Sequence, residues 1–202
     1  MPSQEYVHDN SQNHTRKCYD LTHQPRNSGA SESRMKTSPI CILVMGVSGS
    51  GKSHIGREIA RRIGATFIDA DDHHSATSIA KMSRGEPLND GDREGWLVTL
   101  SGFYQQHIER HETLVIGCSA LKHRYRDLLR RGAPDLKILY LHGNRDTLLA
   151  RLNTRQTHFF HGESMLDSQL RDLEPPSSEE AFRVDIRLSP SQIVERFLQR
   201  IA

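Results

Sequence analysis

The sequence predicts a three-layer α/β domain, in which a parallel sheet of five strands lies between two layers of helices. Short apolar runs that fit buried strands alternate with segments whose apolar residues recur at helical spacing. Such alternation is typical of strands that pair in parallel through right-handed helical crossovers. The length of 202 residues suits one domain of ordinary size.

The first strand is expected at residues 40–45, where apolar side chains follow one another without a polar break. A continuous run of this kind fits a strand that is buried on both faces. Ile55, Ile59 and Ile63 then recur every four residues. They therefore lie on one face of a helix, which we expect to end at Gly64.

The remaining elements continue the alternation. Further strands are expected at residues 66–69, 113–117, 136–141 and 182–186. Further helices are expected at residues 92–111, 121–131, 145–155, 165–173 and 191–201.

The N-terminal residues 1–38 differ from the rest of the chain. They are rich in Ser, Asn, Gln, His and Thr and have no helical or alternating apolar pattern. Such a segment cannot bury enough apolar surface to offset the entropy of ordering it. We therefore interpret it as a flexible polar tail and assign the folded domain to residues 39–202.

The composition excludes several kinds of partner. The chain has 27 Lys and Arg against 25 Asp and Glu, so its charge of +2 provides no broad field for nucleic acid or an anionic membrane. No segment is apolar for long enough to span a membrane or act as a signal peptide. The three cysteines are widely spaced and suggest neither a disulfide framework nor a zinc site. We expect a cytoplasmic protein.

A glycine-rich motif follows the first predicted strand directly. Residues 46–53 read Gly-Val-Ser-Gly-Ser-Gly-Lys-Ser, which fits the pattern G-x-x-x-x-G-K-[ST]. Glycines let successive backbone N–H groups face phosphate oxygens, and the helix N-terminus adds the positive end of its dipole. Lys52 would reach the outer phosphates and the Ser53 hydroxyl would ligate Mg²⁺. The predicted contacts to ATP are Gly46, Ser48, Gly49, Ser50, Gly51, Lys52 and Ser53.

Three classes of protein carry such a phosphate loop. A GTPase would be expected to have an N-K-x-D segment, which this sequence lacks, and a motor ATPase usually has an acid after an apolar strand, where this chain has Gly117-Cys118-Ser119. Acidic residues instead follow the second predicted strand, at Asp69, Asp71 and Asp72. Carboxylates at that edge lie where Mg²⁺ and an acceptor hydroxyl must meet. The pattern favours a small-molecule kinase.

Several longer strings add to this pattern. They are Asp69-Ala70-Asp71-Asp72-His73-His74, Gly85-Glu86-Pro87-Leu88-Asn89-Asp90, Asp92-Arg93 with Trp96-Leu97, Cys118-Ser119-Ala120-Leu121-Lys122, Tyr125-Arg126-Asp127, Arg155 with His158-Phe159, and Ser168-Gln169 with Leu173-Glu174. Together they resemble the gluconokinase family, the small ATP-dependent D-gluconate kinases. The resemblance runs from about residue 42 to the C-terminus.

The resemblance implies a P-loop kinase fold with a small lid at about residues 155–165, and the reaction of ATP with D-gluconate to give ADP and 6-phospho-D-gluconate. It also implies a homodimer. Asp71 would orient or deprotonate the acceptor hydroxyl, and Asp69 would contact Mg²⁺ through water. The alternative is that one of these carboxylates caps the helix that follows.

The family motifs also imply polar contacts to the sugar acid from His74, Arg93, Lys122 and Arg126, although basic residues on helices more often face solvent. Arg151 and Arg155 are spaced to share a helix face, and the resemblance places them at the lid, where they would bind the transferring phosphoryl group, with Arg155 catalytic alongside Lys52 and Asp71. The alternative is an exposed pair of arginines.

Two other functions stay open at this point. One is a kinase of the same fold that acts on another sugar acid or small alcohol. The other is an ATP-binding regulatory protein whose acceptor site has decayed. The chain departs from the family pattern at Ser75, Ser78, Gly95 and Gln156-Thr157, and these changes bear on acceptor specificity and on the lid.

Overall fold

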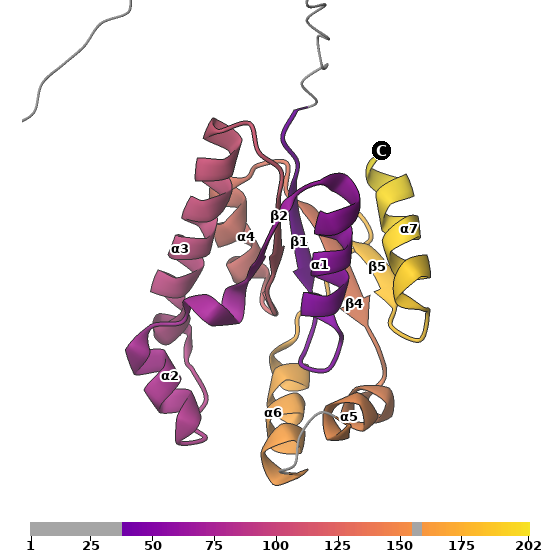
Figure 1. Cartoon of the computed structure of the whole chain (residues 1–202). Coiled ribbons are helices and arrows are strands. Elements are labelled where there is room, and N and C mark those ends of the chain that lie inside the picture. The colour runs from indigo at the N-terminus through magenta and orange to yellow at the C-terminus, as the bar shows by residue number, and fades with distance from the viewer. Residues whose placement is uncertain (1–37, 155–158) are drawn as a thin grey trace, which may run out of the picture. The chain divides into compact units, whose positions relative to one another are not determined.

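Five parallel strands form one sheet in the order β2-β3-β1-β4-β5 (Figure 1). The computed structural model describes residues 38–154 and 159–202, so the predicted tail lies outside the described residues apart from its last position. The strands are β1 (Cys41–Met45), β2 (Thr66–Asp69), β3 (Leu114–Gly117), β4 (Lys137–His142) and β5 (Phe182–Asp185). The predicted five-stranded parallel sheet is confirmed.

Seven α-helices are described. They are α1 (Lys52–Ile63), α2 (Ala76–Ser83), α3 (Asp90–Glu109), α4 (His123–Gly132), α5 (Arg145–Asn153), α6 (Phe159–Asp172) and α7 (Pro190–Ile201), and a short 3₁₀ helix spans Ala70–His73. Helix α3 begins before its predicted start because Asn89 and Asp92 form a capping box. Helix α6 begins at Phe159, so part of the predicted lid is helical, and residues 155–158 lie outside the described residues.

Helix α2 was not predicted from the sequence, for a physical reason. Its large apolar side chains, Ile79 and Met82, are 52% and 41% exposed, so it has no buried apolar stripe to recognise. The helix begins instead at a side-chain cap, where Ser75 accepts a hydrogen bond from the N–H of Ser78. An ion pair of 2.6 Å from Lys81 to Asp92 links it to α3.

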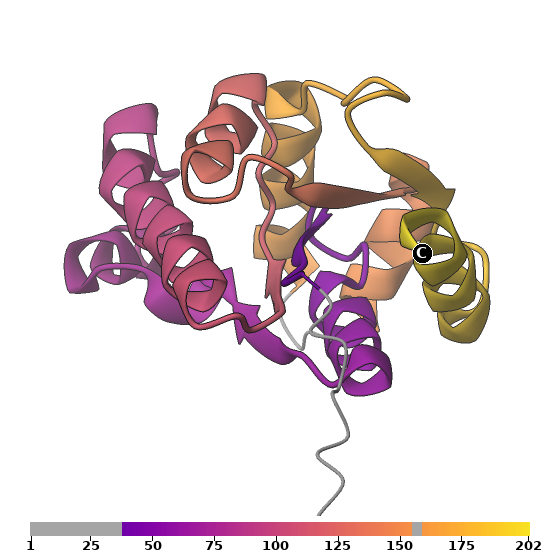
Figure 2. The ribbon, with the colours of Figure 1, turned by 90° about the horizontal axis from the view of Figure 1, so that it is seen from above.

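Alternate residues of the central strand point into two separate cores. Cys41, Leu43 and Met45 pack with α3 and α4 on one face. Ile42 and Val44 pack with α1, α5, α6 and α7 on the other. The view from above shows the sheet with α3 and α4 on one side and α1 and α7 on the other (Figure 2). The structure therefore confirms the three-layer arrangement.

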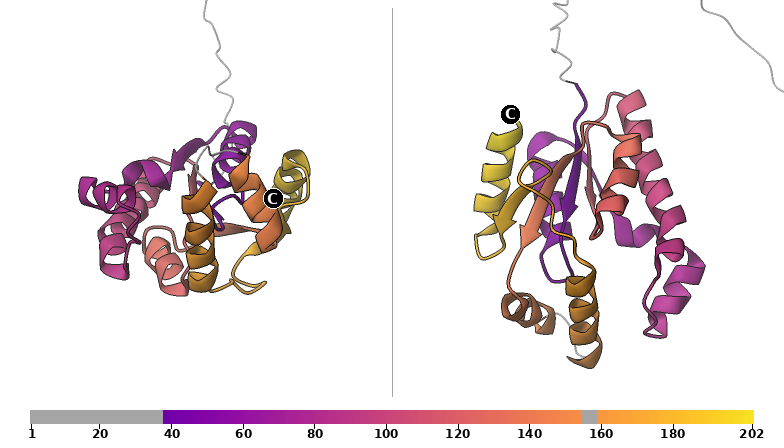
Figure 3. Two further views of the ribbon diagram at one scale, coloured as in Figure 1. Left: turned by 90° about the horizontal axis from the view of Figure 1, so that it is seen from below. Right: turned by 180° about the vertical axis from the view of Figure 1, so that it is seen from behind.

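Helices α2, α5 and α6 lie around the carboxyl ends of the strands (Figure 3). Parallel strands share that edge, so the loops that follow β1, β2 and β3 converge there. No helix in the described ranges is long and apolar enough to cross a membrane.

The contact between α3 and α4 yields a test of this packing. A Cβ added at Gly132 would lie 2.0 Å from the backbone oxygen of Ser101, so Gly132→Ala must push the helices apart. We expect it to lower the free energy of unfolding by about 1–3 kcal/mol, the usual effect of overpacking. Urea denaturation measures this.

Gly102 provides the matched control. It lies in α3, and a Cβ there would meet nothing within 4 Å. Gly102→Ala should therefore raise the free energy of unfolding by about 0.5–1 kcal/mol through helix propensity. Equal effects of the two substitutions would contradict the packing described here.

Candidate active site

The loop between β1 and α1 has the backbone of a phosphate cradle. Gly46 has φ +145°, and a Cβ there would lie 2.6 Å from the backbone oxygen of Leu141. Gly49 has φ +82°, and a Cβ there would lie 2.9 Å from the oxygen of Leu148 in α5. Both positions therefore need glycine, because a side chain would meet backbone atoms in a region that L residues rarely adopt.

Two features of this loop fit an anionic ligand. Helix α1 begins at Lys52 after the N-cap residue Gly51, which supplies no side-chain cap, so its first N–H groups are available to an anion. The Ser50 side chain is buried, and its hydroxyl has no hydrogen-bond partner among the described residues. Ser53 follows in the first turn of α1. The backbone N–H of Ser48 is already bonded to Gln169 of α6.

Lys52 lies between the loop and the acidic segment. Its Nζ donates a hydrogen bond of 3.3 Å to the backbone oxygen of Val47. Burial lowers the pKa of its ammonium group, whereas the nearby carboxylates of Asp71 and Asp69 raise it. The structure thus brings together the predicted phosphate-binding lysine and both predicted carboxylates.

The two carboxylates differ in their surroundings. Asp69 is 16% exposed, accepts a hydrogen bond from the N–H of Asp71 and forms an ion pair of 3.8 Å with Arg57. Its Oδ1 therefore caps the 3₁₀ helix. The Asp71 side chain is 74% exposed and is the more open of the two carboxylates. Its accessibility suits a group that must meet an incoming acceptor.

His74 faces Asp71 from a fixed position. Its ring stacks on Trp96 with centroids 4.2 Å apart, and the Trp96 indole N–H is bonded to the backbone oxygen of Ala70. Its Nε2 lies 3.9 Å from Asp71 Oδ1. Burial lowers the pKa of His74, Asp71 opposes this shift and Arg93 adds to it. Near neutral pH the His74 ring therefore favours its neutral form.

Arg93 and Lys122 reach this region from α3 and from the loop before α4. Arg93 Nε donates to the backbone oxygen of Leu88 at 3.4 Å. Lys122 Nζ is bonded to Asp90 at 3.0 Å, and Asp90 also contacts Tyr125 and Arg124. Asp90 ends the motif at residues 85–90. Its role as the partner of Lys122 was not predicted because the two residues are 32 positions apart.

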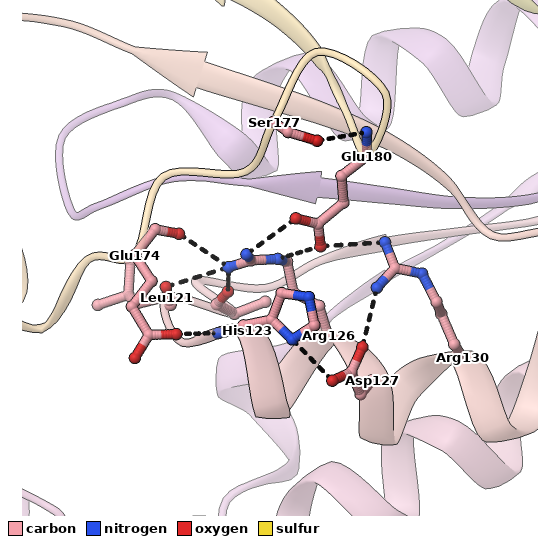
Figure 4. A network of polar contacts seen from close by, with 9 residues as sticks. Leu121, His123, Arg126, Asp127, Arg130, Glu174, Ser177 and Glu180 are labelled. Atoms are coloured by element: carbon pink, nitrogen blue, oxygen red, sulfur yellow. Dashed lines mark hydrogen bonds and ion pairs between the residues drawn. The ribbon is translucent and has the colours of Figure 1, made fainter.

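Arg126 does not have the role expected from the sequence. Its side chain is 1% exposed, and Nε and Nη2 bind both carboxylate oxygens of Glu180 at 2.6 and 3.1 Å. Its Nη1 donates to the backbone oxygens of Ala120, Leu121 and Glu174 (Figure 4). With its guanidinium fully engaged, Arg126 is a structural residue and not a substrate contact.

The partner of Arg126 is held by a second arginine. Arg130 Nη2 lies 3.0 Å from Glu180 Oε1. Burial alone would raise the pKa of Glu180, but the hydrogen bonds and charges of Arg126 and Arg130 lower it below its ordinary value. The pair therefore joins α4 to the segment that precedes β5 as an ionised unit.

The two predicted lid arginines are only partly described. Arg151 lies on α5, and its Nη2 donates to the backbone oxygen of Ile186 at 2.6 Å, beyond the end of β5. Arg155 lies outside the described residues.

Among the positions that depart from the family pattern, Ser78 is buried and its hydroxyl is hydrogen-bonded to that of Ser75. The two serines therefore act within the cap of α2.

Comparison with known proteins decides the family. A family model described as shikimate kinase matches residues 48–202. The thermosensitive gluconokinase of Escherichia coli (strain K12) is 42% identical over 162 residues, which cover 79% of this chain and 86% of that protein. The gluconokinase of Arabidopsis thaliana is 35% identical and covers 80% of this chain and 92% of its own length. The chain belongs to the gluconokinase family.

Solved structures agree with this membership. A crystal structure of a gluconokinase from Sinorhizobium meliloti 1021 is 41% identical, with a TM-score of 0.73 over 82% of this chain and 94% of that one. A shikimate kinase from Acinetobacter baumannii is 18% identical with a TM-score of 0.55, which shows the shared fold alone. The chain therefore has a P-loop kinase domain of the kind that the family model describes, and kinases of this kind use ATP.

The structural role of Arg126 can be tested directly. Arg126→Gln leaves Glu180 buried without its main partner, and we expect a loss of about 3–5 kcal/mol in the free energy of unfolding. Arg130→Gln, whose side chain is 27% exposed, should cost about 1 kcal/mol or less. Urea denaturation compares the two. If the Arg126 variant were as stable as the wild type but bound the acceptor more weakly, the contact to the sugar acid first expected for Arg126 would be supported instead.

The thiol beside the site yields a second prediction. Cys118 is fully buried, and burial raises its pKa to about 12. Burial likewise raises the pKa of Cys41 to about 11. Because the thiolate is the reactive form, iodoacetamide at pH 8 should leave both residues unmodified in the native protein and modify both in urea. Peptide mass spectrometry measures this, and rapid native modification of Cys118 would contradict it.

Proposed function

We propose that the protein transfers the γ-phosphoryl group of ATP to the 6-hydroxyl of D-gluconate, giving ADP and 6-phospho-D-gluconate. The observation that carries the proposal is the open carboxylate of Asp71 beside Lys52 and the phosphate loop. Phosphoryl transfer requires this juxtaposition of an acceptor-orienting group and a cationic phosphate site. The gluconokinase relatives support the choice of acceptor.

The donor side is built from the loop and α1. Backbone N–H groups at the start of α1 would hold the inner phosphates, and the Lys52 ammonium would neutralise charge on the outer ones. Burial lowers the pKa of Lys52, and the carboxylates of Asp71 and Asp69 favour its charged form. Part of the loop is braced by α5, so the phosphates would meet a preformed surface.

We include Mg²⁺ in the proposal, with the Ser53 hydroxyl as a ligand and Asp69 as a contact through water. In the described part of the chain, no group of three or more His, Cys, Asp or Glu side chains is placed to bind a metal. This fits Mg²⁺, which usually takes few protein ligands and completes its shell with water and substrate phosphates. The ion would neutralise charge on the transferring phosphoryl group.

The acceptor side lies around Asp71. Its carboxylate would accept a hydrogen bond from the 6-hydroxyl and take its proton as the new O–P bond forms. The guanidinium of Arg93, whose charge acts on His74, is our candidate for the carboxylate of the sugar acid. His74 offers a neutral ring for a hydroxyl. Lys122 already donates a hydrogen bond to Asp90, so it would contact the sugar acid through another N–H of the same ammonium group.

Two further parts of the proposal concern the oligomeric state of the protein and its location in the cell. We propose a homodimer, as the family resemblance implies, and a cytoplasmic location, in line with three cysteines at unrelated spacings. Light scattering after gel filtration measures the first, and a monomeric mass would refute it.

A panel of sugar acids tests the reaction. ADP release, coupled to a spectroscopic signal, is measured with D-gluconate and with related acids and small alcohols. Turnover on D-gluconate well above background ATP hydrolysis supports the proposal. Turnover on a different acid would assign another acceptor, and tight ATP binding without acceptor-dependent turnover would overturn the kinase activity.

Substitutions at Lys52 and Asp71 test the roles assigned to them. Lys52→Ala should lower kcat by about 10²–10³, because it removes the cation that meets the developing charge. Asp71→Asn should lower kcat by about 10²–10⁴, because an amide cannot take the proton. Asp72→Asn, at the neighbouring exposed carboxylate, is the matched control and should leave kcat within about twofold. Equal losses at Asp71 and Asp72 would refute the assignment.

A further inference from the structure

Gln169 lies on α6 and contacts the phosphate loop. Its Oε1 accepts a hydrogen bond of 2.6 Å from the backbone N–H of Ser48, a residue 121 positions away. A backbone N–H can only donate, so the amide oxygen must face the loop and the amide nitrogen must face away. The contact is therefore directional, and the fold builds it from two distant segments.

This contact completes a clamp on the loop. Gly49 packs against the backbone of α5 on one side, and Ser48 is bonded to α6 on the other. The two helices are themselves joined, because Arg145 of α5 pairs with Asp167 of α6 at 2.7 Å. The position of the loop thus depends on where α6 lies.

Helix α6 is fixed in turn to the loop that precedes α4. Glu174, just beyond the helix, donates its N–H to the backbone oxygen of Leu121 at 2.9 Å. Its Oε2 accepts from the N–H of His123 at 2.6 Å. These bonds flank Lys122, which belongs to the predicted acceptor side. The segment formed by α6 and the residues just after it therefore contacts both the donor-side loop and the acceptor-side loop.

We propose that Gln169 is a positioning residue for phosphoryl transfer, which holds the Ser48 end of the phosphate loop in register with the acceptor side. The inference rests on the proposed function. The start of α1 would hold the inner phosphates, whereas Ser48 stands nearer the other end of the loop. A shift of that end by about 1 Å would misalign the reacting groups and cost up to about 10²-fold in rate.

Removal of the acceptor oxygen tests this role. Gln169→Met keeps the length of the side chain but cannot accept the Ser48 N–H. We expect kcat to fall by about tenfold or more while KM for ATP changes by less than about threefold, since alignment is lost and not ground-state binding. Asp172→Asn, an exposed position on the same helix, is the control and should leave both constants unchanged.

Gln169→Glu separates this role from a general loss of structure. It keeps an acceptor at the same reach, so kcat should return to within about threefold of the wild-type value, while repulsion of the phosphates raises KM for ATP. Equal losses of kcat in the Met and Glu variants would overturn the proposal. So would a Met variant whose kcat stays within about twofold of wild type.

Hydrogen exchange tests the bond between Gln169 and Ser48 without any sugar acid. In the ATP-free protein, the Ser48 amide should exchange at least about tenfold faster in Gln169→Met than in the wild type or in Gln169→Glu. Unchanged exchange would overturn the inference even if D-gluconate is the acceptor. Failure of the wild type to phosphorylate D-gluconate would overturn the proposed function alone, and the kinetic comparison would then use the acid that is turned over.

Discussion

The tight turn after β1 is the constraint on which the rest of the site depends. At Gly46 a Cβ would meet the backbone oxygen of Leu141 and the hydroxyl of Ser50. The chain therefore leaves the sheet in a backbone conformation that requires glycine. That path aims the uncapped N-terminus of α1 at the carboxyl edge of the sheet. Because the strands are parallel, the acidic segment after β2 ends at the same edge, and donor and acceptor groups meet without further elements.

The buried pair of Arg126 and Glu180 has a comparable role on the acceptor side. Burying two charges is costly unless every donor and acceptor is matched, and here the guanidinium meets one carboxylate and three backbone oxygens. These bonds fix the segment after α6 to the loop before α4. The position of α6, and with it the bond from Gln169 to the phosphate loop, therefore depends on an ion pair that never meets the substrate.

The parts of the structure that sequence analysis predicted are those with local causes. The phosphate loop is one continuous string, and the buried strands are continuous apolar runs. Helix α2 was missed because it lacks a buried apolar face. Arg126 was misassigned because a motif indicates that an arginine is needed but not what it binds, and Glu180 lies 54 positions away. Gln169 belongs to the Ser168-Gln169 motif, but no role was predicted for it because its partner Ser48 is also distant in the sequence.

The charges of the site explain how a nearly neutral chain can bind two anionic substrates. Burial lowers the pKa of Lys52 while Asp71 and Asp69 raise it, and burial lowers the pKa of His74 although Asp71 lies beside it. Asp71 thus interacts with both the Lys52 side chain and the His74 ring. In a loose transition state the hydroxyl is oriented first, and its proton would pass to Asp71 as the new O–P bond forms. An open carboxylate next to a stacked, immobile imidazole suits that orienting role.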